Sequence, residues 1–236
     1  MGEDLVKSCE ESIVSTIGED NWNIFQKTSQ CGVVTSEVCR QLLSTNPGGI
    51  DFSAAIMPIM KAFEQELIIH FYLPYLRFLS DKKNGITPNK FVSINNLRNR
   101  KYNGIKLNPH ELRRRIIGRN DTGKYYYRSP YNYQGKIEFT LGDFRFTSGS
   151  EDKKRHSCDT TVIMFYKNEY FGSTVKDSDV GDWVFELAED VYGVSKIRNE
   201  SAHAGITQPL IEAENTMNLL IKVKKLMVEV ANPTLP

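Results

Sequence analysis

The chain of 236 residues has few cysteines, no long apolar segment and almost no net charge. Its four cysteines are scattered along the sequence without a CxxC pair, which excludes a disulfide scaffold and a zinc site of the usual spacing. The longest apolar run, residues 67–79, contains His70, Pro74 and Arg77 and is shorter than the roughly 20 residues that cross a bilayer. The N-terminus is acidic, unlike that of a signal peptide. We therefore expect a cytoplasmic protein with reduced thiols and no membrane partner.

The common motifs of nucleotide-dependent and metal-dependent catalysis are also missing. The sequence has no GxxxxGK[ST] phosphate loop, no GxGxxG dinucleotide motif, no HExxH zinc motif and no GxSxG nucleophile elbow. His70, His110 and His156 lack the spacing of metal ligands. We therefore expect neither a cofactor nor a bound metal.

Three segments have the three- and four-residue apolar spacing of helices that face a core. They cover about residues 56–78, 182–202 and, after a cap at Thr207, the stretch up to about residue 230. Pro58 is expected in a first turn, and Pro74 is expected to kink the end of the first helix. The expected core positions are Ile56, Ile59, Met60, Phe63, Leu67 and Phe71; Val184, Leu187, Ala188, Val191, Val194, Ser195 and Arg198; and Leu210, Ala213, Met217, Leu220, Ile221, Val223 and Leu226.

The remaining segments suggest an interrupted helical domain. Residues 1–49 show no periodicity beyond a short helix near 36–45, and we treat them as an N-terminal extension. Residues 50–236 are expected to form the helical domain, with an insertion at about 82–178. Within the insertion, residues 136–146 fit a strand by their alternation, but Thr140-Leu141-Gly142-Asp143 fits the start of a helix equally well.

The insertion begins with a strongly basic stretch. Residues 82–128 hold thirteen Lys and Arg and only two carboxylates, so the rest of the chain is net acidic. Five tyrosines follow or interleave with these cations, a composition typical of surfaces that follow an RNA backbone and stack unpaired bases. A solvated face that balances the acidic remainder is the alternative. The candidate RNA-binding residues are Arg113, Arg114, Arg115, Arg119, Lys124, Tyr126 and Arg128.

The sharpest local pattern is Arg198-Asn199-x-x-x-His203, at the end of the second expected helix. Arginine offers a fork of donors to phosphate oxygens, and histidine gives or takes a proton near neutral pH. Asn199 and His203 are four residues apart and would share a helical face. In the alternative interpretation the histidine caps the helix and Arg198 pairs with a carboxylate, such as Glu200 or Glu212, or with Glu64 or Glu66 on the first helix.

This pattern, followed at once by another amphipathic helix, resembles the signature of the HEPN superfamily. The helix that contains residues 62–67 also resembles the first long helix of several members, so the resemblance covers about residues 50–80 and 180–230. It implies a mainly α, antiparallel helical bundle, here with a basic, partly irregular or β-containing insertion. It also implies a homodimer in which two motifs line one cleft.

For function, the resemblance implies a metal-independent endoribonuclease. His203 would be the base or acid when the ribose 2′-hydroxyl attacks phosphorus, Arg198 would stabilise the developing charge, and Asn199 would position either partner. The products would be 2′,3′-cyclic phosphate and 5′-hydroxyl ends. Such proteins act as toxins or anti-phage effectors under an antitoxin or sensor protein. A catalytically silent module that binds RNA, a nucleotide or a partner protein is the alternative.

Overall fold

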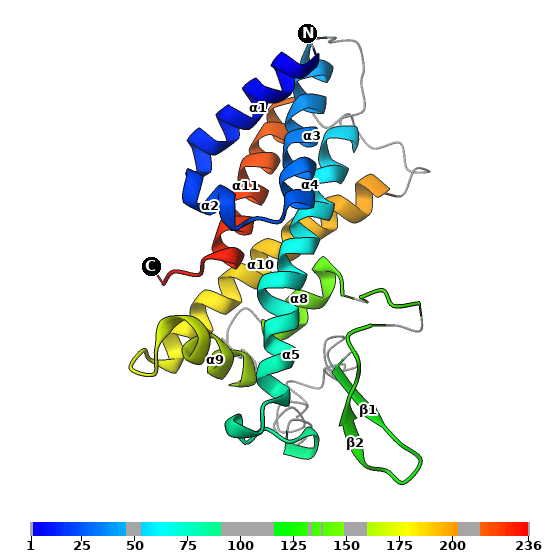
Figure 1. Ribbon diagram of the computed structural model, residues 1–236, viewed down its shortest axis with the longest axis vertical. Helices are drawn as coiled ribbons and strands as arrows, with labels where there is room; N and C mark the ends of the chain where they lie inside the picture. The colour runs from blue at the N-terminus through cyan, green and yellow to red at the C-terminus, as the bar shows by residue number, and fades with distance from the viewer. Residues whose placement is uncertain are drawn as a thin grey trace, which may run out of the picture. The chain divides into compact units, whose positions relative to one another are not determined.

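The computed structural model describes residues 2–45, 53–90, 116–131, 134–137, 139–148, 160–202 and 213–235. Over this part the chain is mainly helical, with a single sheet of two strands (Figure 1). The mainly α fold class predicted from the sequence is therefore confirmed. The chain divides into two compact units, residues 1–71 with 193–233, and residues 72–192 with 234–236. No helix in the described ranges is both long and apolar enough to cross a membrane.

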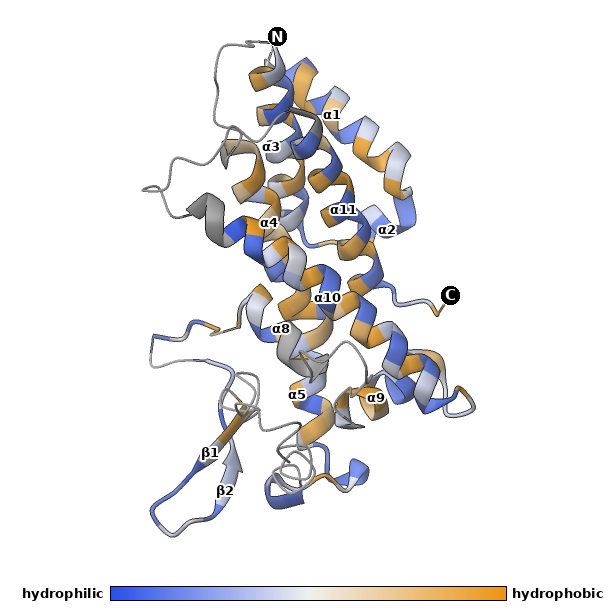
Figure 2. Cartoon of the chain, turned by 180° about the vertical axis from the view of Figure 1, so that it is seen from behind, coloured by the Kyte–Doolittle hydropathy of each residue, from blue (hydrophilic) through white to orange (hydrophobic). Residues whose placement is uncertain are grey.

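The first unit is built around four helices: α1 (Gly2–Ile17), α3 (Lys27–Ser44), α4 (Ser53–Leu67) and α11 (Ala213–Ala231). These helices pack against one another, and the short helix α2 (Glu19–Ile24) contacts α1 and α11 (Figure 1). Coloured by hydropathy in Figure 2, the helices carry apolar residues along one side and polar residues along another. The apolar sides form the core of this unit.

Helix α3 is longer than the short helix predicted near residues 36–45, and its core explains the difference. Its buried residues include Ser29, Gln30 and Ser36, so an apolar periodicity was not visible in the sequence. The Ser29 hydroxyl donates to the Ala62 carbonyl at 3.4 Å, and the Gln30 side-chain amide donates to the Trp22 carbonyl at 2.7 Å. Hydrogen bonds thus offset the cost of burying Ser29 and Gln30, whereas the buried Ser36 hydroxyl has no hydrogen-bond partner among the described residues.

Helices α3 and α4 approach closely at Gly32. An added Cβ at Gly32 would lie 2.9 Å from the Pro58 carbonyl oxygen and 3.1 Å from the Ala62 Cβ. Pro58 itself lies inside α4, which begins at Ser53, rather than in a first turn. The predicted position of Pro58 in the helix was therefore wrong. A proline there removes one backbone donor from the helix.

The apolar stretch 56–78 forms two α-helices joined by a π-helical segment. Helix α4 passes into π-helical residues Ile68–Tyr72, and α5 (Leu73–Ser80) follows with Pro74 in its first turn. The π-helical irregularity therefore precedes Pro74, and the α-helix resumes at Leu73. All six core positions predicted for this stretch are buried.

The second unit contains α5, a 3₁₀ turn (Lys82–Asn84), strands β1 (Ile117–Arg119) and β2 (Tyr125–Tyr127), and α8 (Leu141–Ser148). It continues with α9 (Thr160–Tyr166), a second π-helical segment (Lys167–Phe171), and α10 (Asp177–Ala202), which extends beyond the unit. Its core is aromatic: the Phe165 ring meets the rings of Tyr75, Phe78 and Tyr166, and Tyr166 meets Trp183. The Tyr75 hydroxyl and the Thr161 hydroxyl are 2.5 Å apart, which joins α5 to α9.

The two interpretations of residues 136–146 are decided in favour of a helix from Leu141 onward. The Thr140 backbone N–H and hydroxyl both donate to Asp143 Oδ2, at 2.7 and 2.9 Å. This is one half of a capping box, in which the side chain at the third helical position accepts the N–H of the residue before the helix; the Asp143 N–H donates to the Thr140 carbonyl at 2.9 Å. In the described residues just before α8, Tyr131 and Ile137 form an isolated antiparallel β-bridge.

Helix α10 agrees closely with its prediction, and α11 agrees in part. Helix α10 begins five residues before the predicted start and ends at Ala202, as predicted.

In α11, Leu220, Val223 and Leu226 are buried, but Met217 is 43% exposed, so its core assignment was wrong. The buried face instead follows Thr216, Leu219, Leu220, Val223, Lys224, Leu226, Met227 and Val230. Thr207 and Leu210 lie outside the described residues.

Candidate functional site

Helix α10 carries the first part of the proposed catalytic motif. The predicted stripe is buried at all its positions before Arg198: Val184, Leu187, Ala188, Val191, Val194 and Ser195. Arg198 is half-buried and lies seven residues, about two helical turns, after Val191. The arginine therefore continues the buried face of α10 and does not point directly away from the core.

Asn199 and His203 complete the motif in the sequence. The backbone of Asn199 belongs to the last turn of α10, and its side chain lies outside the described residues. His203 follows the last helical residue, Ala202, and also lies outside them. The assignment of roles to Arg198, Asn199 and His203 therefore stays a prediction.

A buried carboxylate lies near the end of α4. Glu66 is completely buried, and its Oε2 lies 2.9 Å from Nε2 of His70, whose side chain is 17% exposed. The other oxygen, Oε1, accepts the Gln26 backbone N–H at 3.1 Å, at the start of α3. Glu66, one of the carboxylates considered as a partner of Arg198, thus faces the core and lies beside the His70 imidazole. The π-helical segment that holds His70 is a feature often found at functional sites.

A second group of charges lies between α1, α3 and α11. Burial lowers the pKa of Lys224 on α11, and Glu37 on α3 acts in the opposite direction. Glu37 Oε1 also accepts from Arg40 Nε at 3.0 Å. Burial raises the pKa of the Cys9 thiol, and Glu37 raises it further. A thiol with a raised pKa is a poor nucleophile, so we assign Cys9 a role in the packing of the core and not in catalysis.

The described cysteines are all free thiols: Cys9 is buried, Cys39 is half-buried and Cys31 is exposed. Within the described part of the chain, no three His, Cys, Asp or Glu side chains gather as metal ligands would.

Four of the predicted RNA-binding residues lie on one β-hairpin. Strands β1 and β2 pair antiparallel, with Gly118 opposite Tyr126 and Arg119 opposite Tyr125. Between them, Gly123 has a φ of +78°, and its N–H donates to the Asn120 carbonyl at 2.9 Å. A three-residue loop with glycine in the left-handed region is a common hairpin connection. Arg113, Arg114 and Arg115 lie outside the described residues.

The hairpin has two different faces, because successive strand residues point to opposite sides. On one face, the Arg119 guanidinium lies 5.7 Å from the Tyr125 ring centre, and its Nε donates to the Gly123 carbonyl. The Tyr127 hydroxyl donates to the Ile86 carbonyl at 2.8 Å, and burial raises the pKa of Tyr127 to about 12. The other face carries Lys124, Tyr126 and Arg128, all exposed. The strand register separates Tyr126 from Arg119, and the alternation along the strand places Lys124 and Arg128 on the side of Tyr126.

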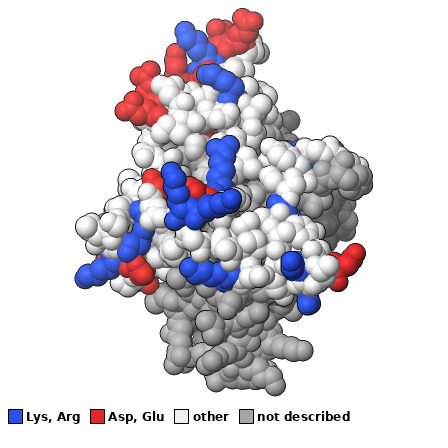
Figure 3. Space-filling view, turned by 60° about the horizontal axis from the view of Figure 1, so that its bottom comes forward, with Lys and Arg blue, Asp and Glu red and all other residues white. Residues whose placement is uncertain are grey.

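Elsewhere the described surface carries charges of both signs. Figure 3 shows Lys and Arg side chains beside Asp and Glu side chains on the face that it draws. Charge alone therefore does not mark a site there, and the hairpin is distinguished by the combination of cations with an exposed aromatic ring.

The comparisons with known proteins give no further support to any family. No protein-family model, no curated protein and no solved structure matches this chain. The resemblance to the HEPN superfamily therefore depends on the Arg198-Asn199-x-x-x-His203 pattern and on the helices that surround it.

Two features were missed by reasoning from the sequence. The Glu66–His70 pair was not predicted, although its spacing of four residues on one helix is a signal for side chains that meet. Gly118 was also passed over. Its place opposite Tyr126 follows from the strand register, which the sequence alone did not provide.

Proposed function

We propose that the chain is a metal-independent endoribonuclease of the HEPN type, with Arg198, Asn199 and His203 as its active-site residues. The observation that carries the proposal is the position of Arg198, half-buried at the end of the buried stripe of α10. An arginine held at the edge of a core is restrained in position, which favours the recognition of a fixed phosphate. The helical surroundings that the resemblance implies agree with the mainly α fold.

The proposed reaction is an attack of the ribose 2′-hydroxyl on the adjacent phosphorus. His203 takes the proton from that hydroxyl or donates one to the departing 5′-oxygen, and Arg198 stabilises the negative charge on the phosphorane. The bond from phosphorus to the 5′-oxygen breaks, which leaves a 2′,3′-cyclic phosphate and a 5′-hydroxyl. The proposed active form is a homodimer in which two motifs line one cleft. A role as a toxin or anti-phage effector, restrained by an antitoxin or sensor protein, belongs to the same proposal.

Substitutions in the Arg198-Asn199-x-x-x-His203 motif test the assignment. His203→Ala removes the general acid or base, and we expect RNA cleavage to fall by about 10²- to 10⁴-fold. Arg198→Lys keeps the charge but loses the planar fork of donors, and we expect a loss of about 10²-fold. Lys196→Ala is the matched control, because this exposed cation lies on the opposite side of the same helix. Sedimentation should show a dimer for all four proteins. Cleavage by His203→Ala at the wild-type rate would contradict the assignment.

The hairpin supports a second candidate function, a catalytically silent module that binds RNA. Lys124, Tyr126 and Arg128 share an exposed face that would hold RNA whether or not the motif on α10 cuts it. This candidate predicts salt-sensitive binding without cleavage at any protein concentration.

A further inference from the structure

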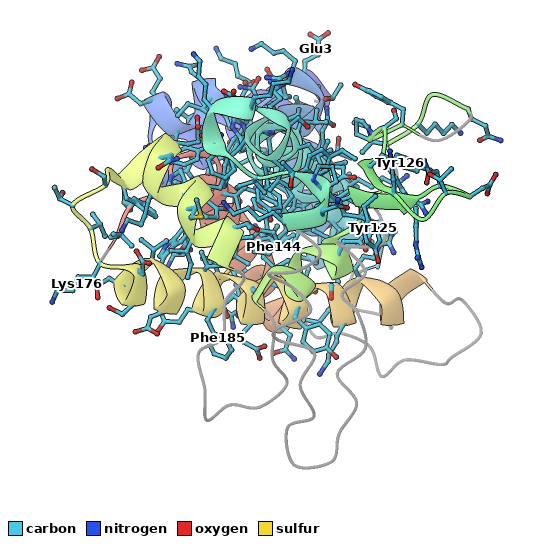
Figure 4. The ribbon with its side chains drawn as sticks, turned by 90° about the horizontal axis from the view of Figure 1, so that it is seen from below. Glu3, Tyr125, Tyr126, Phe144, Lys176 and Phe185 are labelled. Carbon is cyan, nitrogen blue, oxygen red and sulfur yellow. The ribbon has the colours of Figure 1, made fainter. Side chains whose placement is uncertain are left out.

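The three consecutive tyrosines of β2 have different surroundings. Tyr127 is tied to Ile86 by its hydroxyl, and Tyr125 lies under the Arg119 guanidinium. Tyr126 points to the other face of the hairpin and is 48% exposed. Figure 4 labels Tyr125 and Tyr126, which are neighbours on β2. Of these three rings, Tyr126 is the one whose surface is most open to a ligand.

Gly118 determines where the Tyr126 ring lies. An added Cβ at Gly118 would be 2.5 Å from Oη and 2.6 Å from Cε2 of Tyr126, closer than real Cβ atoms approach. The phenol end of the ring therefore occupies the space above Gly118 on the neighbouring strand. An aromatic ring that covers a glycine across a strand pair is held in place by that contact. Tyr126 is thus both positioned and exposed.

Two cations flank this ring on the same face. Lys124 and Arg128 are each two residues from Tyr126, just outside the two ends of β2, so the alternation along the strand places them on the side of Tyr126. Arg128 Nε donates to the Ile117 carbonyl at 3.0 Å, which directs the guanidinium along β1. Asp121 is the only carboxylate in residues 116–131. The exposed face therefore presents an aromatic ring between two positive charges.

We propose that this face binds unpaired RNA, with one base stacked on Tyr126 and the neighbouring phosphates contacted by Lys124 and Arg128. Stacking on an aromatic side chain requires a base whose own face is free, and a base inside a duplex does not offer one. The inference names the substrate class of the proposed ribonuclease and takes RNA as the ligand from that proposed function. It also assigns Gly118 a role, as a positioning residue for Tyr126.

The test is a binding measurement on the full chain carrying His203→Ala, so that the RNA stays intact. The probes are a fluorescent single-stranded RNA and a duplex of the same length, with polyglutamate as a charge control. We expect the single strand to bind more tightly than the duplex. Tyr126→Leu should weaken single-strand binding by about 5- to 150-fold, the effect of losing one stacked base. Tyr126→Phe should bind within about twofold of the parent.

Two further variants make the test specific. Tyr131→Leu is the matched control, because Tyr131 is 50% exposed but lies outside the Lys124, Tyr126 and Arg128 face; its affinity should not change. Gly118→Ala should weaken binding like Tyr126→Leu, because the added methyl group displaces the ring. Circular dichroism of each variant checks that the fold is retained.

The outcomes separate this inference from the proposed function. Equal affinity for single strand and duplex, equal losses from Tyr126→Leu and Tyr131→Leu, or binding of polyglutamate with the same dependence on Tyr126 would overturn it. If the wild-type protein cuts RNA but Tyr126→Leu changes neither binding nor cleavage, the nuclease stands and this inference fails. If binding depends on Tyr126 but the wild-type protein cuts nothing, the inference stands and the nuclease fails.

Discussion

Glu66 Oε2 lies 2.9 Å from His70 Nε2, and the carboxylate is completely buried. One turn of α4 and the π-helical segment after it bring the two side chains together, and the Gln26 backbone N–H binds the second carboxylate oxygen. Burying a carboxylate is costly unless it is paired and hydrogen-bonded; here Oε2 lies beside the His70 imidazole and Oε1 accepts a backbone hydrogen bond. Through its hydrogen bond with the Gln26 N–H, Glu66 therefore ties the start of α3 to the end of α4.

The first prediction concerns this pair. His70→Leu leaves a buried carboxylate without its partner, and we expect the free energy of unfolding to fall by about 2 to 3 kcal/mol. This is below the range for fully buried pairs because His70 is 17% exposed. The double variant Glu66→Gln/His70→Leu removes the charge but keeps an acceptor for Gln26, and it should recover much of the loss. Urea denaturation measures both.

The matched control for that experiment is the exposed pair Lys7–Glu11, which has the same spacing of four residues. Glu11→Gln should change stability by less than about 0.5 kcal/mol, as is usual for surface pairs. If the double variant were no more stable than His70→Leu alone, the uncompensated carboxylate would not be the cause of the loss.

The second prediction concerns the close approach of α3 and α4. Gly32→Ala adds a methyl group 2.9 Å from the Pro58 carbonyl oxygen, so the helices must move apart, and we expect a loss of about 1 to 3 kcal/mol. Gly193→Ala in α10 is the control, because nothing lies within 4 Å of its added Cβ. That variant should gain up to about 1 kcal/mol from helix propensity. Thermal unfolding compares the two, and a stabilised Gly32→Ala would refute the close packing.

The third prediction concerns Lys224, which is 8% exposed and whose pKa is lowered by burial. The folded state disfavours the charged amine, so its cost to stability is largest below the folded pKa and disappears as pH rises past the unfolded value of 10.5. Lys224→Met should therefore be more stable than the wild-type protein at neutral pH, and the advantage should shrink as pH approaches 10.5. Lys225→Met, at an exposed neighbour, should show no such trend in urea denaturation across pH.

The fourth prediction concerns Tyr127, whose pKa is raised to about 12 by burial. Because the folded state favours the neutral phenol, the stability that depends on Tyr127 is fully present below pH 10. It is lost as pH rises from 10 to about 12. The absorbance of tyrosinate, taken as the difference between the wild-type protein and Tyr127→Phe, should show a group that titrates near 12. A difference that titrates at 10 would mean that the phenol is not buried.

The sequence predicted the long helices well where apolar residues occupy core positions. In α10 the stripe from Val184 to Ser195 is buried as predicted, because each turn has an apolar or small residue on that face. In α3 the same reasoning failed, since Ser29, Gln30 and Ser36 occupy the core and are polar. In α11 Lys224 is buried and Met217 is exposed, so side-chain type was a poor guide to the face that packs.

The candidate sites were likewise predicted from the sequence only in part. Spacing alone was enough to single out Arg198 and to suggest the basic tyrosine segment. Residue spacing could not show that Tyr126 and Arg119 face opposite sides of the hairpin. Their sides depend on the position of the turn, which the hydrogen bond between Gly123 and Asn120 determines. The pairing of Glu66 with His70 depends likewise on a π-helical segment, which has no reliable sequence pattern.

The central claim is that the Arg198-Asn199-x-x-x-His203 motif cleaves RNA without a metal. The most direct measurement incubates the wild-type protein and His203→Ala with labelled single-stranded RNA and tRNA in excess EDTA, and then determines the ends of the products. We predict cleavage by the wild-type protein alone, with 2′,3′-cyclic phosphate and 5′-hydroxyl ends. Equal cleavage by both proteins, or products with 5′-phosphate ends, would contradict the account.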